Sequence, residues 1–271
     1  MEQIKTKLER IIQKAEDWYK ENSLMSNPSK TEVIIFTPNR NKNIMIPTIT
    51  AYENGKEIKL EVSENIKVLG VHIDKHMTWN EHITNLRNKT IGIVRHLHRV
   101  NKLLPMKVKL QLYDSLVASH LNYADIIWSG CSSANKQKLQ CVQNFALKSI
   151  LGMKKFDSAT EALKTLNYLT LEEKRTIHAA VFTKKILAGK MPRNITEEYT
   201  KLQPQSNNRS VERGTLNIPA HKSTKFQNSV LYRTVTAWNE TSLDIRNEET
   251  HIFKRKLQTL TTRRKYNTTT P

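Results

Sequence analysis

The carboxylates of this chain are the first side chains to examine for chemistry. Two divalent cations about 4 Å apart, held by at least two carboxylates, catalyse phosphoryl transfer in many enzymes. The sequence contains no pair of adjacent aspartates. Asp125, in the string Tyr123-Ala124-Asp125-Ile126, lies in a helical pattern, and Asp74 is expected to cap a turn. We therefore predict no catalytic carboxylate pair, no metal site and no cofactor in this chain.

The histidines, cysteines and glycines offer little other chemistry. His72, His76 and His82 are spaced by four and then six residues with no cysteine nearby, which matches no known zinc pattern. Cys131 and Cys141 lack Cys-x-x-Cys spacing and are expected to be buried apolar residues or free thiols. Seven glycines supply no glycine-rich phosphate loop, so a nucleotide-hydrolysing site is not expected.

The positive charge of the chain points to binding. The formal net charge is +19, and residues 91–271 contain 30 basic and 13 acidic side chains, against 14 and 12 in residues 1–90. Such an excess favours a polyanionic partner, with nucleic acid first and an anionic membrane second. The alternative is that the charge only keeps the protein soluble, although solubility requires a smaller net charge.

The basic side chains fall into three groups along the sequence, each of which could also be a solvated helix face. The first contains Arg95, His96, Arg99, Lys102, Lys107 and Lys109. The second contains Arg209, Arg213, Lys222, Lys225 and Arg233. The third contains Lys254, Arg255, Lys256, Arg263, Arg264 and Lys265. Such groups can neutralise phosphates without reading sequence, whereas Trp79 and Trp128 are expected to be core anchors and not base-stacking residues.

Length and composition restrict the class of protein. A chain of 271 residues can form one or two domains with proper cores. No apolar run approaches the roughly 20 residues that span a bilayer, and the first residues show no secretory signal. Two cysteines suit a reducing compartment, so an intracellular location is expected, without a choice between nucleus and cytoplasm. The oligomeric state stays open.

The N-terminal part has a mixed helix and strand pattern. We predict a helix over residues 2–22, a strand over 33–36 and a hairpin of residues 46–51 and 56–58 around Asn54-Gly55. A further apolar strand is predicted over residues 66–73, in which Gly70 marks a bulge or a close backbone approach.

From residue 80 onward the pattern is helical. Helices are predicted from Pro105, with Val108, Leu112, Leu116 and Tyr123 on adjoining faces, and over residues 135–151 with Gly152 as the C-cap. Further helices are predicted over residues 159–166, 171–188, 225–238 and 253–260, with a polar linker over 203–222 and a disordered tail from Arg263.

Several strings along the chain resemble those of a known family. They are Val68-Leu69-Gly70-Val71-His72-Ile73-Asp74, Met77-Thr78-Trp79-Asn80-Glu81-His82-Ile83, Tyr113-Asp114-Ser115-Leu116, Leu121-Asn122-Tyr123-Ala124, Trp128-Ser129-Gly130 and Val142-Gln143-Asn144. In this order and at these distances they resemble the end of the palm, the thumb and the C-terminal extension of non-LTR (LINE-type, jockey-like) retrotransposon reverse transcriptases.

The resemblance implies an α+β fold and a division into three parts. Residues 1–79 would be a small palm remnant of one helix and antiparallel strands. Residues 80–202 would be a mainly helical thumb-like domain, and residues 203–271 a basic linker with C-terminal helices. The catalytic aspartates of the family lie upstream of the primer grip, and this chain is expected to start after them.

The resemblance also implies roles for individual residues. Val68, Leu69, Gly70 and Val71 would form the primer grip, which holds the 3′ end of the growing strand. Lys30 matches a lysine for which a general-acid role has been considered, but without a metal site a solvent-facing lysine is the preferred interpretation. Mg²⁺ would be required by the intact enzyme.

Three functional hypotheses follow. The first is a fragment of an RNA-directed DNA polymerase that binds an RNA or DNA primer–template without polymerising alone. The second is a nucleic-acid-binding or partner-binding module that retains no ancestral chemistry. The third is a relic of a truncated mobile element, unstable because its open sheet edges promote aggregation.

Overall fold

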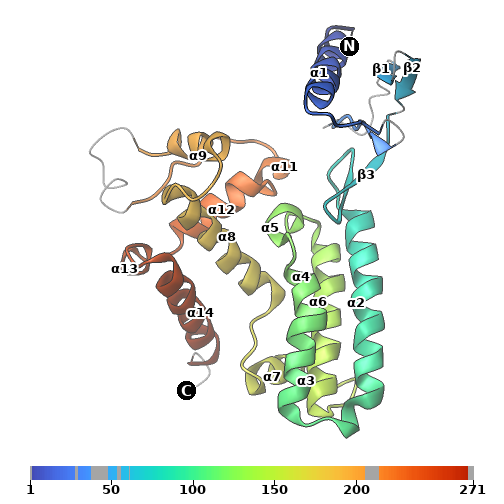
Figure 1. The fold of residues 1–271 in the computed structure, drawn as a ribbon. Coiled ribbons are helices and arrows are strands. Elements are labelled where there is room, and N and C mark those ends of the chain that lie inside the picture. The colour runs from blue at the N-terminus through green and yellow to red at the C-terminus, as the bar shows by residue number, and fades with distance from the viewer. Residues whose placement is uncertain are drawn as a thin grey trace. The chain divides into compact units, whose positions relative to one another are not determined.

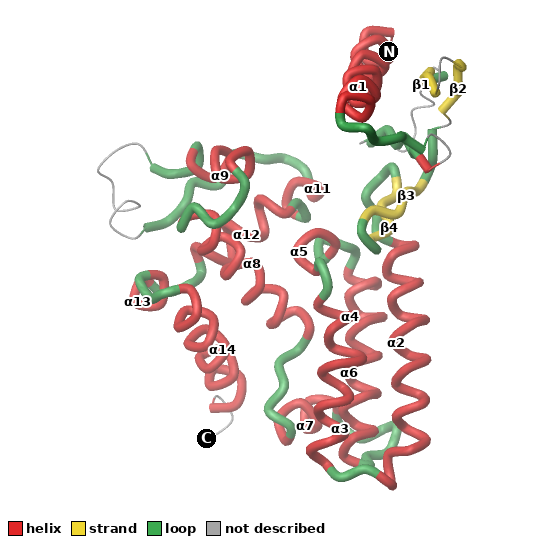
Figure 2. The backbone as a smooth tube through the Cα atoms, in the orientation of Figure 1, coloured by secondary structure: helices red, strands yellow, loops and turns green. Residues whose placement is uncertain are grey.

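The computed structural model describes residues 2–27, 30–37, 48–53, 56–60, 62–204 and 214–267 of the chain (Figure 1). Most of these residues are in helices, and the strands form two small antiparallel sheets of two strands each (Figure 2). The predicted α+β class is therefore confirmed. The chain divides into two compact units, unit 1 over Met1–His82 and unit 2 over Ile83–Pro271.

Unit 1 combines an N-terminal helix with two hairpins. In its described residues the elements are α1 (Glu2–Glu21), β1 (Ile49–Glu53), β2 (Lys56–Leu60), β3 (Asn65–Val68) and β4 (Val71–Asp74). Strands β1 and β2 pair antiparallel with Ile49 opposite Leu60, and these two buried side chains pack against Leu8 and Ile12 of α1. The predicted first helix and first hairpin are confirmed, and the Asn54-Gly55 turn lies outside the described residues.

Two strand predictions in unit 1 are wrong. Residues 33–36 form no strand, because only Val33 makes a bridge, a parallel one with Val62. β-branched residues favour extended backbone, but a strand also needs a partner along its whole length. Residues 66–73 are not one strand but a hairpin, β3 and β4, which reverses at Leu69 and Gly70. Gly70 is thus a turn residue and not a bulge.

The described residues of unit 2 form helices joined by loops. Its elements are α2 (Asn80–Val100, starting just before the boundary), η2 (Asn101–Leu103), α3 (Met106–Leu112), the π-helix η3 (Tyr113–Ala118), α4 (Ser119–Asn122), α5 (Asp125–Trp128), α6 (Ser133–Leu151), α7 (Ala159–Thr165), α8 (Leu171–Leu187), α9 (Arg193–Thr200), α11 (Thr224–Gln227), α12 (Val230–Asn239), α13 (Leu243–Arg246) and α14 (Thr250–Asn267).

The long helices begin and end where capping chemistry places them. The Ser132 hydroxyl accepts the Asn135 N–H at the start of α6, and Gly152 ends it in the left-handed conformation, with φ of +69°. A capping box between Thr170 and Glu173 starts α8. The predictions for α6 and α8, and for Gly152 as a C-cap, are confirmed.

One layer of unit 2 is a bundle of α2, α6 and the α3–α4 segment, which lie side by side in Figures 1 and 2. Helix α2 turns Ile83, Thr90 and Val94 inward, at helical spacing. Further buried side chains of the bundle are Tyr113, Val117, Leu121, Leu139, Val142, Ala146, Leu147 and Ile150. This packing sets which side of α2 is left for solvent.

The second layer packs α9, α12 and α14 around α8. Its core contains Trp238 and Phe253, whose rings stack with centroids 6.0 Å apart. Residues 214–222, predicted as part of a linker, contribute to this layer, because Leu216 is buried and its backbone N–H and carbonyl both bond to the side-chain amide of Asn239. Residues 205–213 of the predicted linker lie outside the described residues.

Two predictions in unit 2 need correction, and two short helices were missed. Helices α9 and α13 were not predicted, and residues 225–238 form two helices separated at Ser229, whose hydroxyl caps α12. Helix α14 continues to Asn267, so the predicted disordered tail from Arg263 is wrong as far as that residue. Among the described residues, no helix is both long enough and apolar enough to cross a membrane.

Candidate nucleic-acid interface

The hairpin of β3 and β4 presents an apolar tip. Val71 is buried, whereas Val68 is exposed and Leu69 is 86% exposed. The two turn residues, Leu69 and Gly70, have φ of +47° and +87°, as a tight type I′ turn requires. A leucine rarely adopts positive φ, so the backbone at Leu69 is strained while its side chain faces solvent.

A carboxylate holds the chain that leaves this hairpin. Asp74 accepts hydrogen bonds from the backbone N–H groups of His76, Thr78 and Trp79 and from the Thr78 hydroxyl, at 2.8–3.1 Å. Burial raises the pKa of Asp74, but these hydrogen bonds outweigh it and keep the pKa below its usual value. The prediction that Asp74 caps a turn is confirmed.

His82 is a buried titratable group of unit 1. Its Nδ1 atom accepts the backbone N–H of His72 at 3.4 Å. Burial, together with the nearby His72 ring, lowers the pKa of His82 from 6.5 to about 4. His82 is therefore neutral in the folded protein at neutral pH, and acidification strains the junction between the hairpin and α2.

We expect unit 1 to lose stability as the pH falls from 6.5 to about 4. In this window His82 is protonated in the unfolded chain and not in the folded chain, so falling pH favours unfolding. The free energy of unfolding should change with pH by an amount that corresponds to the uptake of at most one proton. Urea denaturation followed by tryptophan fluorescence across the window measures the effect. His82→Asn, whose side-chain oxygen can replace Nδ1 as acceptor, should flatten the pH dependence. An unchanged slope in this variant would contradict the assignment to His82.

Lys30 and Asp125 are the two residues that were weighed for a catalytic role. Lys30 is exposed in a turn, where its N–H donates to the Asn27 carbonyl. Asp125 is buried at the start of α5 and accepts a hydrogen bond from His178 Nδ1 at 2.6 Å, so its carboxylate serves this pair. In the part of the chain that the structure describes, no group of three His, Cys, Asp or Glu side chains is placed to hold a metal ion.

The first basic group belongs to a longer segment without acidic residues. Between Glu81 and Asp114 the chain contains no Asp or Glu and seven basic residues, which are Arg87, Lys89, Arg95, Arg99, Lys102, Lys107 and Lys109. All except Lys109 are exposed. Arg87, Arg95 and Arg99 are spaced by eight and four residues and therefore follow one ridge of α2. We call these three residues the α2 ridge. Arg87 and Lys89 were not predicted as site residues, although the missing acids could have indicated them.

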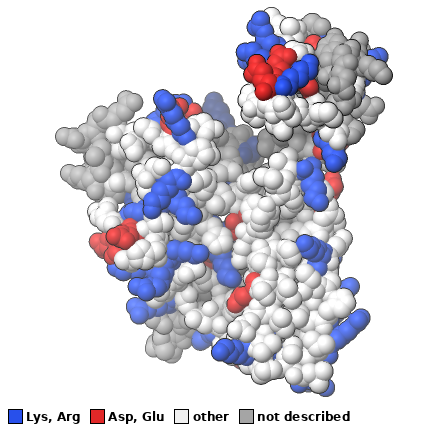
Figure 3. Space-filling model, in the orientation of Figure 1, with Lys and Arg blue, Asp and Glu red and all other residues white. Residues whose placement is uncertain are grey.

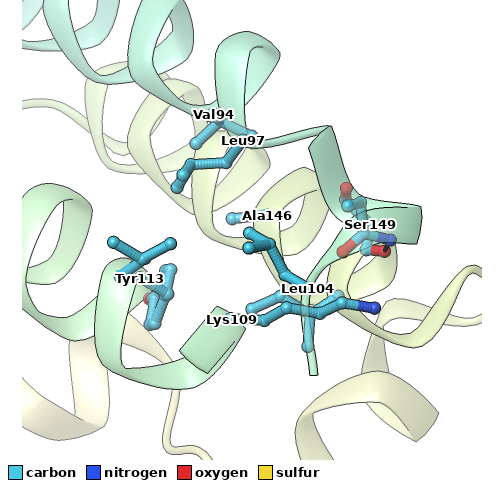
Figure 4. A pocket seen from close by; sticks show the side chains of 10 residues that line it. Val94, Leu97, Leu104, Lys109, Tyr113, Ala146 and Ser149 are labelled. Atoms are coloured by element: carbon cyan, nitrogen blue, oxygen red, sulfur yellow. Dashed lines mark hydrogen bonds between the residues drawn. The ribbon is translucent and has the colours of Figure 1, made fainter. Parts of the chain in front are cut away.

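Lys109 differs from the other members of this segment. It is half-buried and lines a small cavity of about 20 Å³ between α2, α3 and α6 (Figure 4). Val94, Leu97, Leu104 and Ala146 line the same cavity. The stem of Lys109 thus covers apolar surface of the bundle, as long cationic side chains often do.

The second basic group is only partly available for binding. Arg209 and Arg213 lie outside the described residues, and Lys222 and Lys225 are exposed. Arg233, in contrast, is half-buried and donates to the carbonyls of Ile126 and Asn228 and to the Ser129 hydroxyl. Its place in a phosphate-binding group is therefore wrong, because these acceptors within the fold already hold its guanidinium group.

The third basic group lies on α14. Lys254, Arg255, Lys256 and Arg263 are exposed, while Lys256 forms an ion pair with Glu248. Figure 3 shows Lys and Arg side chains gathered over α14 and the helices beside it. The predicted core roles of Trp79 and Trp128 are confirmed, since both are buried and Trp128 donates to the Tyr123 carbonyl. Cys131 is a buried free thiol and Cys141 an exposed one.

Two curated proteins of Drosophila melanogaster match the chain. A probable RNA-directed DNA polymerase from transposon BS is 24% identical over 172 residues, which are 62% of this chain and 18% of that protein. A probable RNA-directed DNA polymerase from transposon X-element is 23% identical over 167 residues, which are 60% of this chain and 18% of that protein. No family model and no solved structure matches.

The chain thus spans less than a fifth of the length of these relatives. Both are RNA-directed DNA polymerases of transposons by name, which agrees with the family that the strings around Leu69-Gly70 and Tyr113-Asp114 resemble. The chain is a region related to the RNA-directed DNA polymerases of non-LTR retrotransposons.

Proposed function

We propose that this chain is the template–primer-binding part of a retrotransposon reverse transcriptase. Residues 1–79 would be the end of the palm, residues 80–202 the thumb and residues 203–271 the C-terminal extension. The names of the two Drosophila relatives support the polymerase origin. The chain would bind RNA or DNA and would not polymerise by itself, because its sequence contains no adjacent aspartate pair to hold the metal ions.

The exposed basic segment of α2, η2 and α3 is the observation that carries this proposal. Six of its seven cations are exposed, and no carboxylate within the segment competes with phosphate for them. Side chains of this kind neutralise phosphates along a backbone and hold a protein in register without reading bases. The α2 ridge would follow one strand of a duplex, because its members succeed one another along a single helix.

The hairpin tip would serve as the primer grip. Leu69 adopts positive φ, although its exposed side chain contributes no packing to the core. Strained residues of this kind cluster at functional sites. Its apolar side chain could rest against the sugar of a terminal nucleotide, while the Asp74 hydrogen bonds fix the hairpin on its base. Lys30 would then be a solvent-facing residue without a catalytic role.

Fluorescence anisotropy with a labelled primer–template tests the proposal. We expect tight binding at about 50 mM salt and a loss of roughly a thousandfold at about 200 mM, as for some six neutralised phosphates. Preference for a recessed 3′ end over a blunt duplex would support the primer-grip assignment. Absence of binding at low salt would contradict the proposed function. Nucleotide incorporation by the purified chain, sensitive to a chelator, would contradict the predicted lack of polymerisation.

A further inference from the structure

One end of the unit 2 bundle exposes two large apolar side chains. Leu103, in the loop between α2 and α3, is 83% exposed, and Phe156, in the loop between α6 and α7, is 92% exposed. Both loops lie at the same end of the bundle (Figure 1), where the Asn101 amide donates to the Ser149 carbonyl near the end of α6. We call Leu103, Phe156 and the exposed basic residues beside them in these loops the bundle tip.

The loop that presents Phe156 is fastened on both sides of it. The Lys148 ammonium group donates to the carbonyls of Lys155 and Asp157, at 2.6 and 3.3 Å. The Asp157 carboxylate accepts the Lys154 N–H at 2.6 Å, so the backbone closes on itself around the aromatic residue. The ring is therefore held out to solvent by a fixed frame and is not the end of a loose loop.

The loop that presents Leu103 is equally well defined. It is a short 3₁₀ turn, η2, in which the Leu104 N–H donates to the Asn101 carbonyl, and Pro105 starts α3 directly after it. The contact of Asn101 with Ser149 and a hydrogen bond between His98 and the Ser149 hydroxyl tie this turn to α6. Such preorganisation reduces the entropy lost when a ligand binds.

Exposed basic residues accompany the two apolar side chains in their loops. Arg99, Lys102, Lys107, Lys154 and Lys155 are exposed in or beside these loops, and the Lys155 ammonium group lies 5.5 Å from the centre of the Phe156 ring. An aromatic ring among exposed cations is suited to a ligand whose planar rings are linked by phosphate groups. Unpaired nucleobases in a single strand have this chemistry, whereas the bases of a duplex already stack on one another.

We propose that the bundle tip binds single-stranded nucleic acid, with an unpaired base stacked on Phe156, Leu103 against another part of the same strand and the cations of these loops on the flanking phosphates. The inference rests on the proposed function and adds to it a site for a strand that is not in the duplex. An anionic membrane is the competing partner, but two apolar side chains bury little area for stable insertion into lipid.

The test measures anisotropy of a labelled oligothymidylate and of a blunt duplex with the full chain. Phe156→Ala is expected to weaken binding of the single strand about tenfold and to leave duplex binding unchanged. Phe156→Trp should restore the affinity, whereas Phe156→Leu, which keeps an apolar side chain without a ring, should not. Leu243→Ala, at an exposed apolar residue of α13, is the matched control and should behave like the wild type.

A second probe reports the stacking itself. A single strand with one 2-aminopurine should lose fluorescence on binding to the wild type and not on binding to Phe156→Ala. Equal affinities of wild type and Phe156→Ala for the single strand, with duplex binding intact, would overturn this inference and leave the proposed function standing. Loss of all nucleic-acid binding at low salt by the wild type would overturn both. Sedimentation with phosphatidylserine vesicles that depends on Phe156 and exceeds binding to the single strand would assign the tip to a membrane instead.

Discussion

Replacement of the α2 ridge, as Arg87→Ala, Arg95→Ala and Arg99→Ala together, is expected to weaken template–primer binding by about a hundredfold or more at low salt. The three side chains are exposed on one ridge of α2. Each phosphate contact contributes about 0.9 to the slope of log K against log salt, so the slope should become less steep by about 2.7. Titrations at several salt concentrations measure both quantities. The fold should persist, because the buried side of α2 is untouched.

A control variant with the same change of net charge distinguishes phosphate contacts of the α2 ridge from the general attraction of a positive protein for nucleic acid. Lys7→Ala, Lys14→Ala and Lys20→Ala together also remove three positive charges, from exposed sites on α1. We expect this variant to keep a salt slope close to that of the wild type. If both triple variants reduced the slope equally, binding would depend on net charge alone, and the α2 ridge would have no special role.

Gly130→Ala is expected to destabilise unit 2 by about 3 kcal/mol or more. A Cβ atom at Gly130 would lie 2.0 Å from the carbonyl oxygen of Asn228 and 3.0 Å from its carbonyl carbon. These are backbone atoms in the turn between α11 and α12, so relief requires this part of the backbone to move. Such a shift would also strain the bonds of Arg233 to Ile126 and Ser129. Chemical denaturation followed by circular dichroism would measure the loss.

Gly92→Ala provides the comparison within the same unit. Gly92 lies inside α2, and a Cβ atom there would meet nothing within 4 Å. Alanine lowers the entropy of the unfolded chain, so this substitution should stabilise the protein by about 0.5–1 kcal/mol. If both substitutions destabilised the protein by a similar amount, contact with the Asn228 backbone would not be what makes Gly130 sensitive.

The fold was predictable where local chemistry decides it. Helices α6 and α8 have capping residues and apolar stripes that tertiary contacts do not overrule. The segment after Pro105 was harder, because residues 113–118 form a π-helix. Its wider turn changes the phase of the apolar pattern, so Tyr113, Val117 and Leu121 are buried while Leu116 and Tyr123 face solvent. A period of 3.6 residues cannot reveal this shift.

The candidate site was predictable only in part, since charge can be read from a sequence and burial cannot. The exposed members of the first basic group were named correctly as cations, but only packing shows that Lys109 lies along a cavity and that Arg233 is bonded within the fold. Phe156 was missed because a single aromatic residue in a polar loop has no periodic pattern. The Lys148 frame around it depends on contacts seven and nine residues apart.

Helix α6 separates a packing contact of unit 2 from its bundle tip by a fixed length. Its 19 residues span about 28 Å, with the Gly130 and Arg233 contacts near its first residue and the Phe156 loop after its last. Sites this far apart usually contribute independently to free energy. In a double variant, Gly130→Ala should therefore lower stability as it does alone, and Phe156→Ala should lower single-strand affinity as it does alone.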